Sequence, residues 1–173
     1  MPNLAVIDCG TNTFHLLIAA PQADGGFTEV YRERRFIKLA EGGISSIGAA
    51  AYQRALDALI DYADIIKDHQ VVATRVSGTA AMRTASNGLA LQVEVKAKTG
   101  LQIDIIPGKE EAQLIYQGVQ QAIGSQNERW MVMDIGGGSV EFIIVDKQGV
   151  RWFESFPIGV AVLYKQLHQT EPI

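Results

Sequence analysis

Two short segments, far apart in the chain, each place an aspartate just before a turn of small or hydroxylated residues. Asp8 precedes one turn and Asp134 precedes the other, and in both segments a glycine follows two residues later. Because glycine has no Cβ, a bulky anion can approach its backbone N–H group, while hydroxyl and amide side chains can donate to the same oxygens. Each turn therefore predicts phosphate binding, although a glycine-rich hairpin without a ligand is the alternative for either turn alone. The residues assigned to phosphate are Gly10, Thr11, Asn12 and Thr13 in the first turn and Gly136, Gly137, Gly138 and Ser139 in the second.

Carboxylates stand at the rim of both turns. Asp134 and Glu141 flank the second turn, and Asp8 stands before the first. A phosphate and two carboxylates can share a site only when a cation lies between them, and oxygen ligands of this kind suit Mg²⁺. We therefore predict Mg²⁺ as the cofactor, with Asp134 and Glu141 as ligands. Asp8 has two interpretations, a further metal ligand or an acceptor that fixes the first turn through backbone N–H groups.

The segments around the two turns follow the same plan. Residues 4–19 and 130–147 each consist of an apolar run, the aspartate and its turn, and a second apolar run. Two β-type runs joined by such a turn indicate a hairpin. Two copies of one unit in a chain suggest a duplicated lobe with a ligand bound between the copies.

Apolar spacing between the copies predicts alternating strands and helices. At 173 residues and 47% hydrophobic, the chain can bury a substantial core. The order predicts an α/β fold whose mixed sheet is flanked by helices. We expect one lobe over residues 1–124 and the beginning of a second over 129–173, joined by a polar linker at 124–129. The expected strands between and after the hairpins lie at 27–37, 71–76, 101–106 and 150–156, and the expected helices lie at 48–68, 87–98, 109–123 and from 160 onward.

Composition excludes several classes of protein. The net charge of −4 and the lack of a basic run argue against nucleic-acid binding. A single cysteine, Cys9, excludes a disulfide framework and is interpreted as a small buried thiol. Since the sequence shows neither a signal peptide nor an apolar segment of membrane length, we expect a cytoplasmic protein without a membrane partner. His15, set among apolar residues, is interpreted as a core histidine.

Five motifs in order resemble the exopolyphosphatase and guanosine pentaphosphate phosphatase (Ppx/GppA) family, of the actin, sugar kinase and heat-shock ATPase superfold. They are IDCGTNT, TAAMR, GKEEAQLIYQGV, MDIGGGSVE and FPIGVAVL. The resemblance implies two ribonuclease-H-like lobes with the active site in the cleft between them. It also implies Mg²⁺-dependent hydrolysis of the terminal phosphoanhydride of polyphosphate or of pppGpp.

The resemblance also implies roles for particular residues. Glu111, the second acid of the GKEEA element, matches the catalytic glutamate of the family. Arg83 matches an arginine at a helix start, where it and Thr79 are assigned to phosphate. Lys38 stands where the family pattern leads us to expect an arginine.

Two alternatives to a phosphohydrolase remain at this stage. One is an ATP-using kinase or actin-like ATPase of the same superfold, and the other is a non-catalytic module that binds polyphosphate or the alarmone. We also expect a homodimer, or alternatively aggregation, through residues 130–173, because the apolar strands there need covering and three strands with one helix are marginal for stability.

Overall fold

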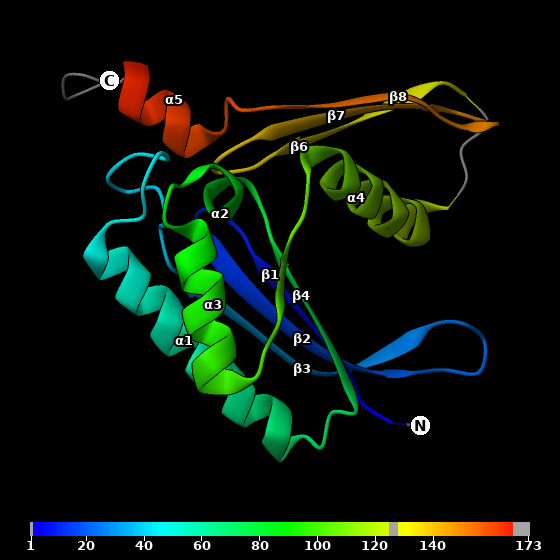
Figure 1. Ribbon diagram of the computed structural model, residues 1–173. Helices are drawn as coiled ribbons and strands as arrows, with labels where there is room; N and C mark the ends of the chain where they lie inside the picture. Colours follow the sequence, from blue (N-terminus) through cyan, green and yellow to red (C-terminus); the bar gives the residue numbers. More distant parts are fainter. Residues whose placement is uncertain (1, 125–127, 168–173) are drawn as a thin grey trace.

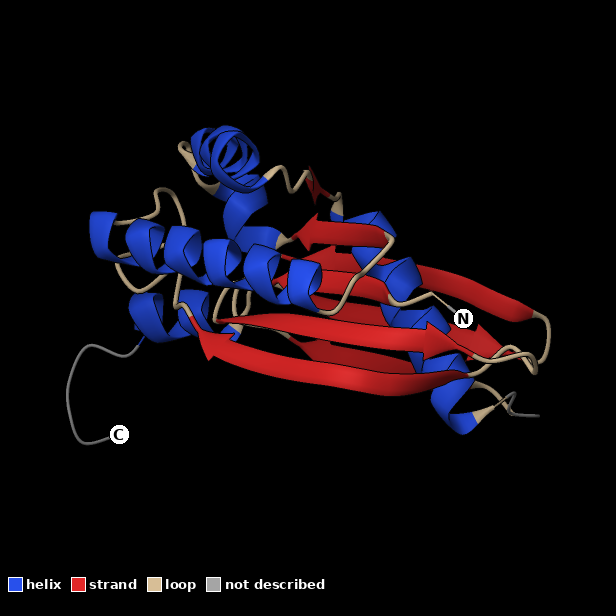
Figure 2. Cartoon of the chain, turned by 90° about the horizontal axis from the view of Figure 1, so that it is seen from below, coloured by secondary structure: helices blue, strands red, loops and turns tan. Residues whose placement is uncertain are grey.

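The computed structural model describes residues 2–124 and 128–167, and it contains two sheets (Figure 1). In the described residues the larger sheet has the strand order β3-β2-β1-β4-β5, and the smaller one has the order β6-β7-β8. Its strands are β1 (Leu4–Cys9), β2 (Thr13–Pro21), β3 (Phe27–Phe36), β4 (Ala73–Gly78), β5 (Ile103–Ile105), β6 (Trp130–Ile135), β7 (Val140–Asp146) and β8 (Gly149–Phe156). Its helices are α1 (Ala49–Asp68), α2 (Ala80–Thr84), α3 (Gly88–Thr99), α4 (Gly108–Ile123) and α5 (Val160–Leu167). Figure 2 shows the strands running lengthwise with helices on either side, so the predicted α/β class is confirmed.

The first sheet is mixed because β1 pairs in opposite senses with its two neighbours. It is antiparallel to β2 and parallel to β4, which returns after α1. Side chains alternate between buried and exposed along β1, so one face of the sheet packs into the main core beneath α1 and α3. Helix α1 contributes a stripe at helical spacing, in which the fully buried Tyr62 donates its hydroxyl to the carbonyl of Phe14 at 3.2 Å.

Alternation along the second strand corrects the interpretation of His15. Phe14 and Leu16 are fully buried, whereas His15 between them is exposed. Its Nε2 lies 3.0 Å from the hydroxyl of Thr13, and its register partner on β1 is Asp8. His15 is therefore a surface histidine beside the first turn, because successive side chains of a strand point to opposite faces. Cys9, at the end of β1, is the buried thiol that was predicted.

Helix α4 packs against the second sheet. Its fully buried Ala112 joins Val132, Ile143 and Val145 in a small separate core, and Ile115, Tyr116 and Val119 pack around it. Figure 1 shows α4 running beneath β6, β7 and β8. At the last position of α4, Ile123 is 53% exposed and lies outside this core.

The packing of α4 bears on the expected division of the chain. A boundary at 124 assigns this helix to the first lobe, yet its apolar face lies on β7 and β8. We therefore propose that the second unit begins before α4, near Pro107. Residues 125–127 of the expected linker lie outside the described residues.

The face of the second sheet opposite α4 is apolar and open. Met131, Met133, Ile135, Trp152 and Phe156 lie on it, and each is more than a third exposed. Cross-strand register places Met131, Ile144 and Trp152 in one row of this face. Among the described helices, none is long and apolar enough to cross a membrane.

Ile143→Ala tests whether α4 belongs with the second sheet. Ile143 is 1% exposed in the small core, so the substitution is expected to cost about 2–5 kcal/mol there. Amide hydrogen exchange should then lose protection in α4, β6, β7 and β8 together, while β1, β2 and β4 keep theirs. Ile144→Ala, on the opposite face of the same strand, is the matched control with a smaller effect. If α4 keeps its protection along with β1 and β4, the boundary at 124 is the right one.

Candidate active site

The two predicted turns have the same backbone geometry. The N–H of Gly10 donates to the carbonyl of Thr13 at 3.1 Å, and the N–H of Gly136 donates to the carbonyl of Ser139 at 2.9 Å. A Cβ added to either glycine would lie 2.9 Å from that same carbonyl oxygen. Each turn therefore needs glycine at its first position for the same local reason, as expected of two copies of one unit.

The two turns also face each other at very short range. A Cβ on Gly137 would lie 2.7 Å from the amide nitrogen of Asn12. One on Gly138 would lie 2.5 Å from the hydroxyl oxygen of Thr11 and 2.6 Å from the Cβ of Ala80. The sequence suggested that these glycines leave room for an anion. The structure adds a different reason, since Gly137 and Gly138 leave room for the opposite turn.

Backbone hydrogen bonds hold both turns from behind. The N–H groups of Ile37 and Lys38 donate to the carbonyl of Asn12, at 2.9 and 3.0 Å. At the second turn, the N–H groups of Val160 and Ala161 donate to the carbonyls of Gly136 and Gly137, at 2.9 and 2.8 Å. Because these carbonyls are hydrogen-bonded behind the turns, they do not face the cleft. The polar groups that face it are hydroxyl, amide and carboxylate groups.

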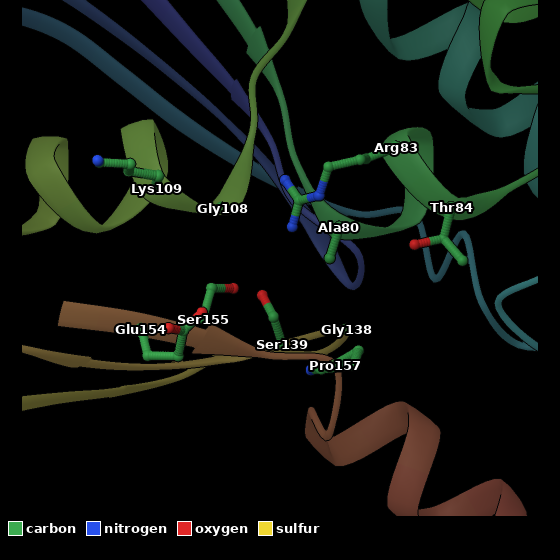
Figure 3. A pocket seen from close by; sticks show the side chains of 10 residues that line it. All are labelled: Ala80, Arg83, Thr84, Gly108, Lys109, Gly138, Ser139, Glu154, Ser155 and Pro157. Atoms are coloured by element: carbon green, nitrogen blue, oxygen red, sulfur yellow. The ribbon is translucent and has the colours of Figure 1, made fainter.

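A cleft of about 420 Å³ lies between the turns. It brings together every residue assigned from the sequence except Arg83: Asp8, Gly10, Thr11, Asn12, Thr13, Thr79, Glu111, Asp134, Gly136, Gly137, Gly138, Ser139 and Glu141. Arg83 lines an adjoining cavity together with Gly138 and Ser139. Figure 3 shows Arg83 reaching down from α2, with Ser139 and Ser155 pointing up toward it from the second sheet.

Arg83 lies close to the helix start expected from the sequence. Helix α2 begins at Ala80, directly after Thr79, and Arg83 is the fourth of its five residues. Its Nη1 donates to the carbonyl of Ile106 at 2.7 Å and lies 3.2 Å from a carboxylate oxygen of Glu111. These two contacts orient the guanidinium.

Glu111 lies in the first turn of α4 and turns toward the cleft. Burial, together with the negative charges of Glu141 and Asp8, raises the pKa of its carboxyl to about 7 against the lowering effect of Arg83. The neighbouring Glu110 points elsewhere and pairs with Arg75 at 2.8 Å, where both side chains are largely exposed. Of the two adjacent acids, Glu111 is therefore the one that can act in the cleft.

Three more carboxylates surround the turns. Glu141 is 1% exposed and accepts a hydrogen bond of 2.6 Å from the hydroxyl of Ser155. Asp134 is its register partner on β6. Asp8 lines the cleft, and the pKa of its carboxyl is raised. Burial is the main cause and the negative charge of Asp134 adds to it, while His15 acts in the opposite direction.

These carboxylates fit a hard cation only in part. Within the part of the chain that the structure describes, no three His, Cys, Asp or Glu side chains converge into a complete metal site. Asp8, Asp134 and Glu141 therefore do not form a closed set of ligands by themselves. Oxygen donors and concentrated negative charge suit Mg²⁺, provided that water or phosphate oxygens complete the coordination.

Ser155 is a candidate residue that the sequence did not reveal. Besides its bond to Glu141, it meets the first residue of α4, because a Cβ on Gly108 would lie 2.6 Å from the Cβ of Ser155. Ser155 thus lies where the helix of Glu111 meets the strand beside Glu141. The only signal in the sequence was a small polar residue two positions after Phe153, and its side of β8 has meaning only once the register of Ser155 with Glu141 is known.

The sequence was compared with known proteins and protein families. The sequence profile of the Ppx/GppA phosphatase family matches residues 17–173. A guanosine-5'-triphosphate,3'-diphosphate pyrophosphatase of Photobacterium profundum is 37% identical over 160 residues, which are 91% of this chain and 32% of that protein. Exopolyphosphatase 2 of Mycobacterium tuberculosis is 32% identical over 182 residues, which are 99% of this chain and 57% of that protein. This chain therefore spans between about a third and just over half of the length of these relatives.

The fold is also similar to that of solved structures. A crystal structure of an exopolyphosphatase from Cytophaga hutchinsonii superposes with a TM-score of 0.94 at 40% identity. The match covers 99% of this chain and 55% of that one. The same arrangement of two turns and two sheets is therefore present in an experimental structure, as part of a longer chain.

Ser155→Ala is expected to destabilise the protein by about 1–3 kcal/mol, because it leaves the buried carboxylate of Glu141 without its hydroxyl donor. Urea unfolding measures the loss. Ser86→Ala, at an exposed serine after α2, is the control with a change near zero. A double-mutant cycle with Glu141→Ala should show coupling between the two positions, and strict additivity would contradict the assignment.

Proposed function

Because this chain belongs to the Ppx/GppA phosphatase family, we propose that it carries the catalytic cleft of a phosphohydrolase that cleaves the terminal phosphoanhydride of inorganic polyphosphate or of pppGpp. The observation that supports this most is the setting of Glu111. Its carboxyl has a pKa of about 7, contacts Arg83 and faces two opposed turns of the type that bind phosphates. A group with that pKa can both accept and release a proton near neutral pH.

The chain's own residues divide the chemistry among them. Gly10, Thr11, Asn12 and Thr13 bind one part of the phosphate chain, and Gly136, Gly137, Gly138 and Ser139 bind another. Glu111 orients a water molecule and takes its proton as the oxygen attacks the terminal phosphorus. Arg83 lies 3.2 Å from Glu111, so its positive charge is close to the place where the water attacks. From there it stabilises the negative charge of the transferring phosphoryl group. Thr79, 8% exposed in the cleft wall, contributes a hydroxyl to the same surface.

A divalent cation is part of this proposal, and Mg²⁺ is the ion we assign. Asp134 and Glu141 would hold it, with Asp8 as a third carboxylate on the opposite side of the cleft. When bound, the ion neutralises phosphate charge beside these carboxylates. The donor types support this choice, since all three supply carboxylate oxygens.

Glu111→Gln is expected to lower kcat by roughly 10²–10⁴-fold with little change in binding of the phosphate chain, because the amide cannot accept the proton of water. Phosphate release from tripolyphosphate by the complete protein measures kcat. Glu110→Gln is the matched control, since Glu110 pairs with Arg75 outside the cleft. A mild effect at Glu111 with a severe one at Glu110 would reverse the assignment.

The carboxyl of Glu111 also determines how activity and stability depend on pH. The groups that face it are Arg83 from α2, Glu141 from β7 and Asp8 from β1. Since the base acts when deprotonated, kcat/KM should rise with pH through about 7. Its raised pKa also means that the folded chain keeps a proton that the unfolded chain loses, so stability falls as pH rises from the ordinary range of a glutamate to about 7. Glu111→Gln should remove both effects.

We propose a homodimer formed through the open apolar face of the second sheet. Met133 and Trp152 on this face are 49% and 44% exposed, and an apolar sheet face of this kind favours association. Sedimentation velocity over a range of concentrations should show a monomer and dimer in exchange. Met133→Glu with Trp152→Glu should shift the equilibrium to monomer, whereas Leu89→Glu on α3 should not. If the unaltered protein has the mass of a monomer at all concentrations, this interface is wrong.

A further inference from the structure

The cavity that Arg83 lines is a second opening beside the cleft, and we call it the side cavity. It has a volume of about 240 Å³ and shares a wall with the cleft, made of Ala80, Gly138 and Ser139. Its rim consists of exposed residues: Thr84, Lys109, Glu154 and Pro157. The side cavity therefore runs from the wall of the cleft to the solvent (Figure 3).

The inner end of the side cavity offers hydrogen-bond donors. Ser139 is 3% exposed, and among the described residues its hydroxyl has no hydrogen-bond partner. Figure 3 shows this hydroxyl and the guanidinium of Arg83 facing each other across the side cavity. Arg83 donates to Ile106 and contacts Glu111 through Nη1 alone, so its other N–H groups are left for a ligand. A hydroxyl and a guanidinium both suit the oxygens of a phosphate.

The beginning of α4 forms another part of the wall. Gly108, its first residue, lies so close to Arg83 that an added Cβ would be 3.7 Å from Nη2. The first N–H groups of the helix with a backbone partner are those of Glu110 and Glu111, which donate to Pro107. The preceding N–H groups therefore lie at the wall of the side cavity without an intrahelical partner. A helix N-terminus with such groups attracts anions.

The rim carries one charge of each sign. The Nζ of Lys109 lies 5.3 Å from the centre of the Phe153 ring, and within residues 2–124 and 128–167 this lysine forms no ion pair. Glu154 supplies the negative charge. The lysine attracts a small anion toward the rim, and the carboxylate opposes its retention there. This balance suits the passage of an anion better than its storage.

The proposed hydrolysis needs free space on one side of the terminal phosphorus. In an in-line displacement the attacking water and the leaving oxygen stand on opposite sides of that phosphorus. The water oxygen bonds to phosphorus, its proton passes to Glu111, and the bridging oxygen leaves with the shortened chain. The new orthophosphate then lies between the shortened chain in the cleft and the wall that carries Arg83 and Ser139. It can leave before the chain only through an opening on that side.

A third space, of about 480 Å³, also reaches Glu111 but suits orthophosphate poorly. Its walls are mainly apolar, with Val6, Leu114 and Ile115 among them. The charged groups that it shares with the cleft are all carboxylates. An anion would lose hydration there and meet charges of its own sign. Of the two spaces, the side cavity is therefore the better route.

We propose that the side cavity is the exit for orthophosphate, which binds beside Arg83 and Ser139 while the shortened chain is still in the cleft. The inference rests on the proposed function and adds the order in which the products leave. A chain that stays bound after each cleavage can move forward by one phosphate without dissociating.

Product inhibition of the complete protein, with tripolyphosphate as substrate and Mg²⁺ present, tests the order of release. Orthophosphate that leaves first through the side cavity should lower kcat, and excess tripolyphosphate should not overcome this inhibition. Pyrophosphate, which leaves the cleft last, should compete with tripolyphosphate. If both products share one opening, pyrophosphate has to leave first and the two patterns exchange.

Two variants act on the rim of the side cavity. Lys109→Ala should weaken inhibition by orthophosphate by roughly two- to fivefold, the effect of one exposed charge pair. Thr84→Trp should narrow the rim and slow release without slowing bond cleavage. Acid-quenched samples of Thr84→Trp should therefore show a burst of orthophosphate that a sensor of free phosphate does not detect.

Two control variants keep these changes away from the side cavity. Lys147→Ala removes an exposed lysine in the turn between β7 and β8, and Ser86→Trp adds an indole at an exposed position after α2. Neither position lines the side cavity, so neither variant should alter inhibition by orthophosphate or produce a burst.

Inhibition by orthophosphate that excess tripolyphosphate overcomes would overturn the exit route and leave the proposed function intact. So would a Thr84→Trp variant in which cleaved and free orthophosphate appear together. If the complete protein does not hydrolyse tripolyphosphate or any longer polyphosphate or pppGpp, the proposed function is wrong and the exit route falls with it.

Discussion

The contact between the two turns is the constraint on which the rest of the structure depends. Gly137 and Gly138 lie so close to Asn12 and Thr11 that a single added carbon on either glycine would overlap the opposite turn. Two chain segments separated by more than a hundred residues can meet in this way only if the strands that lead into them are rigid. Paired strands supply that rigidity, and the hydrogen bonds from Lys38 and Val160 hold the turns from behind.

Helix α4 connects the two halves of the site. Its apolar face packs on the second sheet through Ala112. Glu111, in its first turn, contacts Arg83, whose guanidinium also donates to the carbonyl of Ile106. Ser155 lies at the junction, against Gly108 and bonded to Glu141. The acidic groups of the cleft thus come from both sheets, and burial, together with their mutual repulsion, keeps the pKa of Glu111 near neutrality.

Features that are local in the chain were predictable from the sequence. The Asp-x-Gly turns could be recognised because their defining hydrogen bond, from Gly10 to Thr13 or from Gly136 to Ser139, spans only three residues. The α/β class followed from apolar spacing. His15 was misplaced although the alternation of Phe14 and Leu16 on either side of it already pointed it outward.

Ser155 and the partner of α4 could not be predicted, because cross-strand register and the choice of the sheet that a helix covers are set by tertiary packing. Only the family resemblance favoured Glu111 over Glu110 in the sequence. Its physical reason is the rotation of α4 about its axis, which the packing of the helix on the second sheet determines.

The mounting of α4 makes the base sensitive to the relative position of the two sheets. Glu111 is carried on the second sheet together with Glu141, whereas Arg83 is carried on the first. Any change in the distance between the sheets would therefore alter the burial of Glu111 and its distances to Arg83 and Asp8 at once, and with them the pKa of its carboxyl. The contacts that bring the two sheets together thus also set the proton affinity of the base between them.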